Sequence, residues 1–202
     1  MRLNLAAFRT EYSDMQLTMQ DLTEAGIYES VTANAGKSTI NGAEIEAKLL
    51  VGDFTFNASI GYLDAGFDDF FATLTGSGAP TDNSNLPLAF APDWTASLGG
   101  VYELATSVGT VTLQASATYT DDMYTSFTPL NATSDLTLRK ANILVDATVA
   151  LTTLDGHWRF ALWGKNLTDK HQINNTFPIG PLFADSVYGP PRTWAAEASY
   201  RF

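Results

Sequence analysis

The 202-residue sequence has no cysteine, only two histidines and no apolar run long enough for a membrane-spanning helix. Without cysteine, neither a disulfide framework nor a thiolate metal site is possible. A spanning helix needs about 20 consecutive apolar residues, so a membrane could be crossed only by strands. The histidines, His157 beside a predicted turn and His171 in a loop, belong to no Ser-His-Asp pattern of recognisable spacing. We therefore predict that the chain is not an enzyme and holds no cofactor.

Charged residues are also scarce. They make up 16 % of the chain, against about 25 % in typical soluble domains, and threonine, serine, asparagine and alanine take their place. The net charge of −11 argues against a nucleic-acid partner, because lysine and arginine are the residues that neutralise phosphates. Residues 1–12 do not form a secretory signal, since Asn4 and Arg9 interrupt a short apolar stretch. We expect any export signal to lie outside this chain.

The sequence does contain strong alternation. In its last stretch, the apolar side chains from Trp194 to Phe202 occupy the even positions, the period-two pattern of a strand with two unlike faces. Seven earlier segments repeat this pattern, and the first is the weakest: Leu3 and Leu5 share one parity, Phe8 and Tyr12 the other, so its orientation stays open. The predicted strands cover residues 2–14, 37–51, 54–63, 94–104, 111–120, 142–151, 157–167 and 192–202.

The connections between these segments alternate in length. Short turns are predicted at Gly52-Asp53, near Thr106-Ser107 and at Asp155-Gly156. Four longer connections lose the period and are rich in turn-forming residues, so we expect long loops there, the first of them a loop or a frayed hairpin. These loops cover residues 15–36, 64–93, 122–139 and 168–191. Tight turns at one end and long loops at the other are typical of a transmembrane β-barrel.

From the second predicted strand onward, the apolar face carries no Asp, Glu, Lys or Arg. A Lys or Arg there would cost about 2–4 kcal/mol at a bilayer midplane, which gives the exclusion a physical cause. Aromatic residues mark the ends of this face, at spacings that match a tilted spanning strand of about 9–11 residues. We predict that seven of them form two membrane girdles: Phe54, Tyr62, Trp94, Tyr102, Tyr119, Trp158 and Trp194.

The predicted fold class is therefore all-β, a transmembrane antiparallel β-barrel with about eight strands in this chain. A soluble up-and-down barrel alternates in the same way but turns its apolar face inward. That alternative would leave an outer face of threonine, serine and asparagine with unusually few charges.

Five stretches of the sequence carry a family resemblance. They make the chain resemble the carboxy-terminal part of TonB-dependent outer-membrane receptors over nearly its whole length, with the Asn-Leu-Thr-Asp and Gly-Pro-Pro-Arg segments as the more specific signals. The stretches are LNLAAFRTEYSDMQ (3–16), NGAEIEAKLLVGDFTFNASIGYLDAGFDDF (41–70), PLAFAPDWTASLGGVYEL (87–104), WGKNLTDK (163–170) and GPPRTWAAEASYRF (189–202).

The resemblance implies a bacterial outer-membrane location and a 22-stranded barrel of which residues 1–202 form about the last third. It implies uptake of an iron–siderophore complex or another scarce nutrient, with outer-membrane lipid, a plug domain and the TonB energy-coupling complex as partners. The signal peptide, TonB box, plug and earlier strands are expected outside this chain. A terminal aromatic strand also resembles the signal that the barrel assembly machinery recognises, which gives Tyr200 and Phe202 that expected role.

The residues leave some questions open. A self-standing eight-stranded outer-membrane barrel, structural or adhesive, is the competing prediction for function. Asp64, Asp68 and Asp69 could hold a hard cation, but their spacing is not that of a calcium loop and we predict no metal site.

Two groups of side chains also have two readings each. Loop aromatics either contact a ligand or pack the loops on one another: Phe67, Phe70, Phe71, Phe127, Phe177 and Phe183. For the charged side chains on the polar face, the family resemblance implies that they face the plug or the lumen, and simple cross-strand pairing in a wet interior is the more economical interpretation: Glu44, Glu46, Lys48, Glu103, Asp146, Arg159, Lys165, Glu197 and Arg201.

Overall fold

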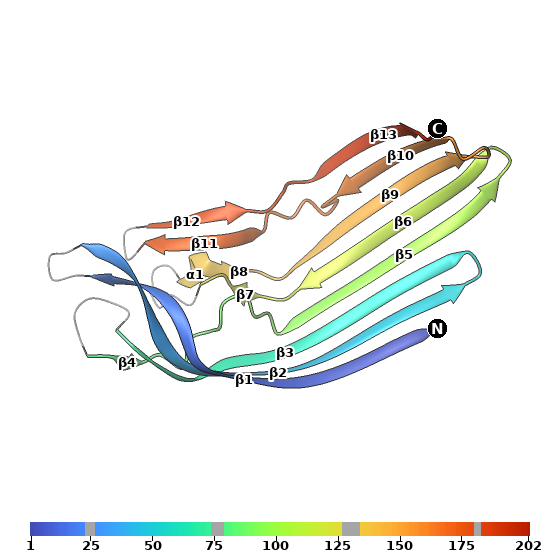
Figure 1. Ribbon diagram of the computed structural model, residues 1–202. Coiled ribbons are helices and arrows are strands. Elements are labelled where there is room, and N and C mark those ends of the chain that lie inside the picture. The colour runs from blue at the N-terminus through green and yellow to red at the C-terminus, as the bar shows by residue number, and fades with distance from the viewer. Residues whose placement is uncertain (23–26, 74–78, 127–133, 180–182) are drawn as a thin grey trace.

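The computed structural model describes residues 1–22, 27–73, 79–126, 134–179 and 183–202. One large antiparallel sheet dominates it, with the strand order β1-β2-β3-β5-β6-β9-β10-β13 and the two-residue β4 paired to the end of β3 (Figure 1). The strands of this sheet are β1 (Arg2–Leu22), β2 (Tyr28–Val51), β3 (Phe54–Ala72), β4 (Thr81–Asp82), β5 (Trp94–Thr106), β6 (Gly109–Thr120), β9 (Asn142–Thr153), β10 (Trp158–Lys165) and β13 (Thr193–Tyr200).

Smaller elements stand at the end of the sheet that carries the long connections (Figure 1). Two separate antiparallel pairs form there, β7 with β8 and β11 with β12. The bounds are β7 (Met123–Tyr124), α1 (Ser134–Thr137), β8 (Leu138–Arg139), β11 (Ile173–Ile179) and β12 (Phe183–Tyr188). In the described part of the chain, no helix is long and apolar enough to cross a membrane.

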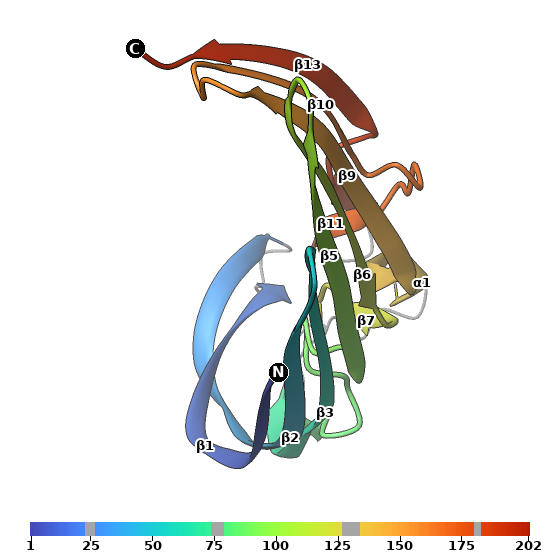
Figure 2. The ribbon, with the colours of Figure 1, turned by 90° about the vertical axis from the view of Figure 1, so that its right-hand side faces the viewer.

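The sheet is an open arc (Figure 2). Strands β1 and β13 lie at its two ends, and the outer edge of each pairs with no described strand. Both chain termini lie at the end of the sheet that carries the short turns (Figure 1). The predicted all-β antiparallel architecture and the eight successive strands are therefore confirmed, in an arc that is not closed.

The first hairpin is longer than its sequence pattern predicts. Residues 15–36 were expected as a loop or a frayed hairpin, and the hairpin is what forms, because Gln16–Leu22 pairs with Tyr28–Asn34. Register shifts on both sides of Met15 explain the lost alternation. Each shift moves side chains to the other face, so a single period cannot describe the whole strand.

Three other predicted loops also contain regular structure, so those predictions were wrong in part. Strand β3 continues to Ala72, well into the expected loop 64–93. The expected loop 168–191 contains the β11–β12 hairpin, and the expected loop 122–139 contains β7, α1 and β8. Strands that leave a lipid boundary with water on both faces need no apolar–polar alternation, which hides them from a periodicity argument.

The register settles which way the first strand faces. Leu3 lies opposite Ala47 and Leu5 lies opposite Ile45, so these leucines share the apolar face of β2. Phe8 is on the polar face and covers Gly42, where an added Cβ would lie 2.3 Å from the Phe8 ring. A larger residue at position 42 would displace that ring.

The main buried apolar cluster lies at the loop end of the sheet. A cluster of Phe67, Phe70, Ala72 and Leu88 is buried there, and residues 86–91 pack over β3. A register shift at Lys37/Ser38 adds one residue to β3, so Phe67 and Phe70 share the polar-face side although they are three apart. Their ring centroids are 4.7 Å apart. The rest of the described sheet is a single layer, in which the small side chains of Ala150 and Ala161 are buried.

Candidate functional site

Aromatic pairs stand at two levels of the apolar face. Toward the short turns, Phe54 lies opposite Tyr102 and their rings stack with centroids 4.1 Å apart. Toward the long connections, Tyr62 lies opposite Trp94 at 4.8 Å. Eight residues separate the two levels on β3, or about 27 Å along the strand. At a tilt of about 40° this becomes about 21 Å of height, close to the roughly 25 Å apolar band of outer-membrane barrels.

The other predicted girdle residues lie at or next to these levels. Trp158 faces Tyr200 at the turn end, with centroids 4.9 Å apart. Trp194 lies beside Gly164 at the loop end and is 75 % exposed. Tyr119 lies opposite Ala96, two residues closer to the middle of the sheet than the Tyr62–Trp94 level. The geometry is compatible with two membrane girdles, which themselves stay a prediction.

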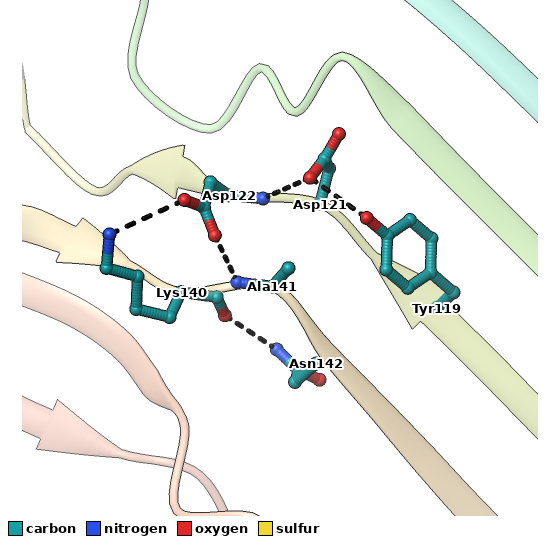
Figure 3. Close-up of polar contacts among 6 residues, drawn as sticks. All are labelled: Tyr119, Asp121, Asp122, Lys140, Ala141 and Asn142. Carbon is teal, nitrogen blue, oxygen red and sulfur yellow. Dashed lines mark hydrogen bonds and ion pairs between the residues drawn. The ribbon is translucent and has the colours of Figure 1, made fainter.

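Two carboxylates, Asp121 and Asp122, follow the end of β6 just beyond the loop-end aromatic level (Figure 3). At this point the pairing of β6 with β5 and with β9 ends. The Tyr119 hydroxyl donates to Asp121 Oδ1 at 2.9 Å, and the Asp121 amide donates to the Trp94 carbonyl. Asp122 accepts from the Ala141 amide and lies 3.5 Å from Lys140 Nζ. Backbone donors that lose their ladder partners are thereby satisfied, and the carboxylates stand just beyond the aromatic level.

The two motifs that carried the family resemblance most specifically meet in space. We call this contact the terminal junction and define it as residues 166–170 together with residues 190–192. Asn166 is 8 % exposed, and its Nδ2 donates to the carbonyls of Lys170 (2.9 Å) and Pro190 (3.2 Å). Asp169 Oδ2 lies 3.3 Å from Arg192 Nη2. Residues 24 positions apart are thus tied at the start of β13.

The terminal junction also holds β9. The Asn166 amide donates to Asp146 Oδ1 at 2.8 Å, and the Thr168 hydroxyl donates to the Ile143 carbonyl at 2.8 Å. Asn166 and Asp169 have φ of 50° and 53°, a conformation that Asn and Asp adopt more readily than most residues. Asn166, directly after β10, therefore bonds to β9 through its backbone amide and to the segment before β13 through its side-chain amide.

At the opposite end, the Asp155 turn joins β9 to β10. The Thr153 hydroxyl and the His157 amide donate to Asp155 Oδ1 at 2.5 and 3.0 Å. The hydrogen bond from Thr153 has the larger effect and the one from His157 the smaller, and both lower the pKa of Asp155 below its ordinary value. His157 Nδ1 lies 2.8 Å from the Arg201 carbonyl, so this histidine holds the residues after β13.

The polar face carries sparse pairing. Arg159 lies opposite Ser199 and its guanidinium reaches Glu197 at 3.4 Å. Asn4 donates to Glu46 at 3.1 Å, at a shallow recess of about 340 Å³ between β1, β2, β3 and β5. The expected cross-strand pairing is therefore found for Arg159 with Glu197. Such exposed pairs contribute about 0–1 kcal/mol each.

The loop aromatics divide into two groups. Phe67 and Phe70 are buried and pack the β3 end, whereas Phe71 and Phe177 are 59 % and 53 % exposed. Phe127 and the side chain of Phe183 lie outside what the structure describes. Phe90 was not among the loop aromatics predicted from the sequence. Its side chain is 52 % exposed, its φ is 59°, and its backbone amide donates to the Tyr124 carbonyl. A positive φ at a bulky residue costs energy and has no sequence signature.

The acidic residues considered for a cation do not converge. Asp68 Oδ2 accepts a hydrogen bond from the Thr39 hydroxyl at 2.7 Å, and Asp69 lies opposite Lys37. Within the described ranges, no group of three or more His, Asp or Glu side chains is arranged to hold a metal ion. The geometry gives no support to a cation at Asp64, Asp68 and Asp69.

Antiparallel meander, alternating faces and long connections at one end define a sheet of the outer-membrane barrel type. The family model "TonB dependent receptor-like, beta-barrel" matches residues 1–167. The chain therefore belongs to the TonB-dependent receptor-like β-barrel family. No curated protein sequence matches it.

Solved structures share the fold at low sequence identity. The chain is similar to the ferric yersiniabactin uptake receptor from Yersinia pestis (TM-score 0.76, 17 % identity), with 99 % of this chain matching 27 % of that one. A siderophore receptor from Acinetobacter baumannii gives a TM-score of 0.70 at 20 % identity, with 98 % and 26 % covered. The ferric-catecholate import receptor from E. coli gives 0.67 at 21 %, with 100 % and 25 % covered. The chain thus spans about a quarter of their length.

Proposed function

We propose that the chain is the carboxy-terminal wall of an outer-membrane receptor that imports an iron–siderophore complex. Family membership and the two levels of paired aromatics, Phe54–Tyr102 and Tyr62–Trp94, support this proposal. The apolar face then contacts lipid and the polar face lines the lumen. A plug domain outside this chain closes that lumen, and the TonB complex supplies the energy for transport.

The substrate side of the proposal rests on the loop end. Exposed aromatic side chains stand there, among them Phe71, Phe90 and Phe177. The buried Phe70 anchors the end of β3 directly before Phe71, so this ring is presented from a rigid base. Aromatic side chains offer a large contact area at a low cost in conformational entropy. They would contact the organic shell of an iron complex as it enters.

The test is uptake of radioactive iron by cells that lack the whole receptor or carry variants of it. We expect loss of import for at least one ferric siderophore, restored by the wild-type gene. Replacing Phe71, Phe90 and Phe177 together with alanine should weaken binding of that siderophore at unchanged membrane levels. Unchanged import of every siderophore offered to the deletion strain would overturn the iron proposal.

A self-standing eight-stranded barrel is the second candidate, favoured by the eight strands that follow one another across the main sheet, with the two-residue β4 off this path. Such a barrel would need β1 to pair with β13, whereas the two strands lie at opposite ends of an open arc (Figure 2). A closed small barrel migrates faster on a gel before heating than after. Heat-dependent migration of the refolded 202-residue chain would favour this candidate over the receptor wall.

We also propose that Tyr200 and Phe202 address the chain to the barrel assembly machinery. Their rings meet edge to face with centroids 5.2 Å apart, and Phe202 is fully exposed. An exposed aromatic pair at a free strand edge is open to a partner chain. Deleting Phe202 should reduce the amount of receptor in the outer membrane far more than its affinity for siderophore. Equal membrane levels would contradict this role.

A further inference from the structure

Strand β13 has few side chains that could define its register. Its neighbour is β10, and no described strand pairs its other edge. At the centre of this pairing, Phe160 lies opposite Ala198 and Leu162 lies opposite Ala196. A slip of two residues would keep every side chain on its own face. Of Phe160 and Leu162, one would then lie opposite the other alanine, and the second would lie opposite Trp194 or Tyr200, depending on the direction of the slip. The slip would move the strand by about 7 Å.

Such a slip would carry the chain end out of place. In the observed register the Arg201 amide donates to the His157 carbonyl at 2.8 Å, and Tyr200 stands against Trp158. Moved by 7 Å, the Tyr200–Phe202 pair would leave the turn-end aromatic level. A feature that selects one register is therefore needed for the terminal aromatics to be presented where they are.

The terminal junction has the properties of that feature. Asn166 holds the Pro190 carbonyl through a buried side-chain amide, and Asp169 holds Arg192 directly before β13 begins. Pro190 and Pro191 have restricted φ angles, so a hold on Pro190 is passed stiffly to Thr193. A two-residue slip would break both contacts. It would also leave Asn166 Nδ2 with the Lys170 carbonyl as its acceptor, so that one N–H of this buried amide loses the Pro190 acceptor, which is costly.

We infer that the terminal junction is the register pin of the last strand, with Asn166 as the positioning residue for the aromatic chain end. The inference rests on the proposed function only for placing the sheet in an outer membrane. The contacts at His157 and Trp158 then follow from the register rather than selecting it.

The sequence has no cysteine, so disulfide trapping can report the register. Ala161 lies opposite Glu197, and the pair Ala161→Cys with Glu197→Cys reports the native register. Pairing Ala161→Cys with Ser199→Cys or with Ala195→Cys reports the two slipped registers. Oxidation is carried out on whole cells producing the full receptor, so that inserted and uninserted chains are both scored.

We expect Asn166→Ala to raise the ratio of slipped to native disulfide at least about tenfold, the effect of one lost buried hydrogen-bonding side chain. Asn166→Gly keeps the backbone conformation accessible and should behave alike. Asp169→Ala should raise the ratio less than the Asn166 variants do. The double variant Asp169→Arg with Arg192→Asp exchanges the two charges of the ion pair and should return the ratio to its wild-type value. Trp158→Ala, at the turn end, should leave the ratio unchanged.

An unchanged ratio in both Asn166 variants would overturn the inference, as would an increase found only with Trp158→Ala. The proposed function fails separately, if the wild-type protein is absent from the outer-membrane fraction. A wild-type protein that is present there, with a register insensitive to Asn166, would refute the pin alone.

Discussion

The two ends of the arc are fastened by opposite kinds of contact. The β1–β3 end carries an apolar cluster in which Phe70 is 0 % exposed. The β9–β10–β13 end carries the terminal junction, built from hydrogen bonds around Asn166 and one ion pair. Removal of apolar area from water stabilises the first. The second depends on polar groups that must all remain paired.

Strand length explains the difference. Strands β1, β2 and β3 have 21, 24 and 19 residues and rise beyond the loop-end aromatic level, where residues 86–91 can cover them as a second layer. Strands β10 and β13 have eight residues each. They end near that level, and no described segment forms a second layer over them. Their backbone ends are instead satisfied by side chains, as in capping of other elements.

The largest expected effect comes from breaking the apolar fastening. Phe70→Ala should destabilise the β1–β3 end by about 3–5 kcal/mol, because a fully buried ring leaves a cavity. The loss of stability is measured by urea unfolding of the receptor in lipid vesicles, with protease cleavage of the segment around residues 79–93 as the readout. Phe71→Ala is the matched control, since that neighbouring ring is exposed. Equal effects of the two variants would contradict the assignment of Phe70 to a core.

The second-largest expected effect comes from removing the side-chain hydrogen bonds of Asn166 at the terminal junction. Asn166→Ala should cost about 1–3 kcal/mol, because the Lys170 and Pro190 carbonyls lose a donor in a buried setting. The protease-sensitive region should now be the β13 end and not residues 79–93. Asn57→Ala, on the exposed polar face of β3, is the control and should stay within about 0.5 kcal/mol of wild type. A loss of protection at both ends would mean that the two fastenings are not independent.

The aromatic levels are common to both ends and should behave alike. Double-mutant cycles to alanine on Phe54–Tyr102 and on Trp158–Tyr200 should each give coupling energies of about 0.5–1.5 kcal/mol. The ring centroids are 4.1 and 4.9 Å apart, so the two rings of each pair are in direct contact. A coupling found at only one of the two pairs would show that the levels do not form one belt.

Strand positions could be predicted from the sequence where one face of the sheet is apolar and the other polar. The structure beyond the loop-end aromatic level, where this alternation is lost, could not. Alternation between Phe54 and Tyr62 follows from one apolar and one polar face, so strand position and facing could be predicted. The buried Phe67–Phe70 pair could not, because three-residue spacing places two strand residues on opposite faces unless a register shift intervenes. The shift at Lys37/Ser38 depends on tertiary pairing.

The terminal junction shows a second limit. Both of its motifs were singled out in the sequence, through the family resemblance, yet their contact could not be inferred. The side-chain amide of Asn166 reaches Pro190 only because Asn166 and Asp169 take positive φ. Asn and Asp tolerate this conformation without requiring it, so the residue types alone do not announce the turn.

The smallest effect concerns the Asp155 turn, which joins the two strands that the terminal junction holds at their other ends. Hydrogen bonds from Thr153 first and His157 second lower the pKa of Asp155. A carboxyl with a lowered folded pKa stabilises the turn above its ordinary pKa of about 3.9, and the contribution is lost as pH falls from there through the folded value. Asp155→Asn should therefore lower the urea midpoint at neutral pH, with the difference from wild type vanishing in acid. Thr153→Ala removes the hydrogen bond that lowers the pKa of Asp155 most, so the stabilisation should be lost at a higher pH than in wild type. A difference in urea midpoint between Asp155→Asn and wild type that persists unchanged in acid would exclude the carboxylate as its cause.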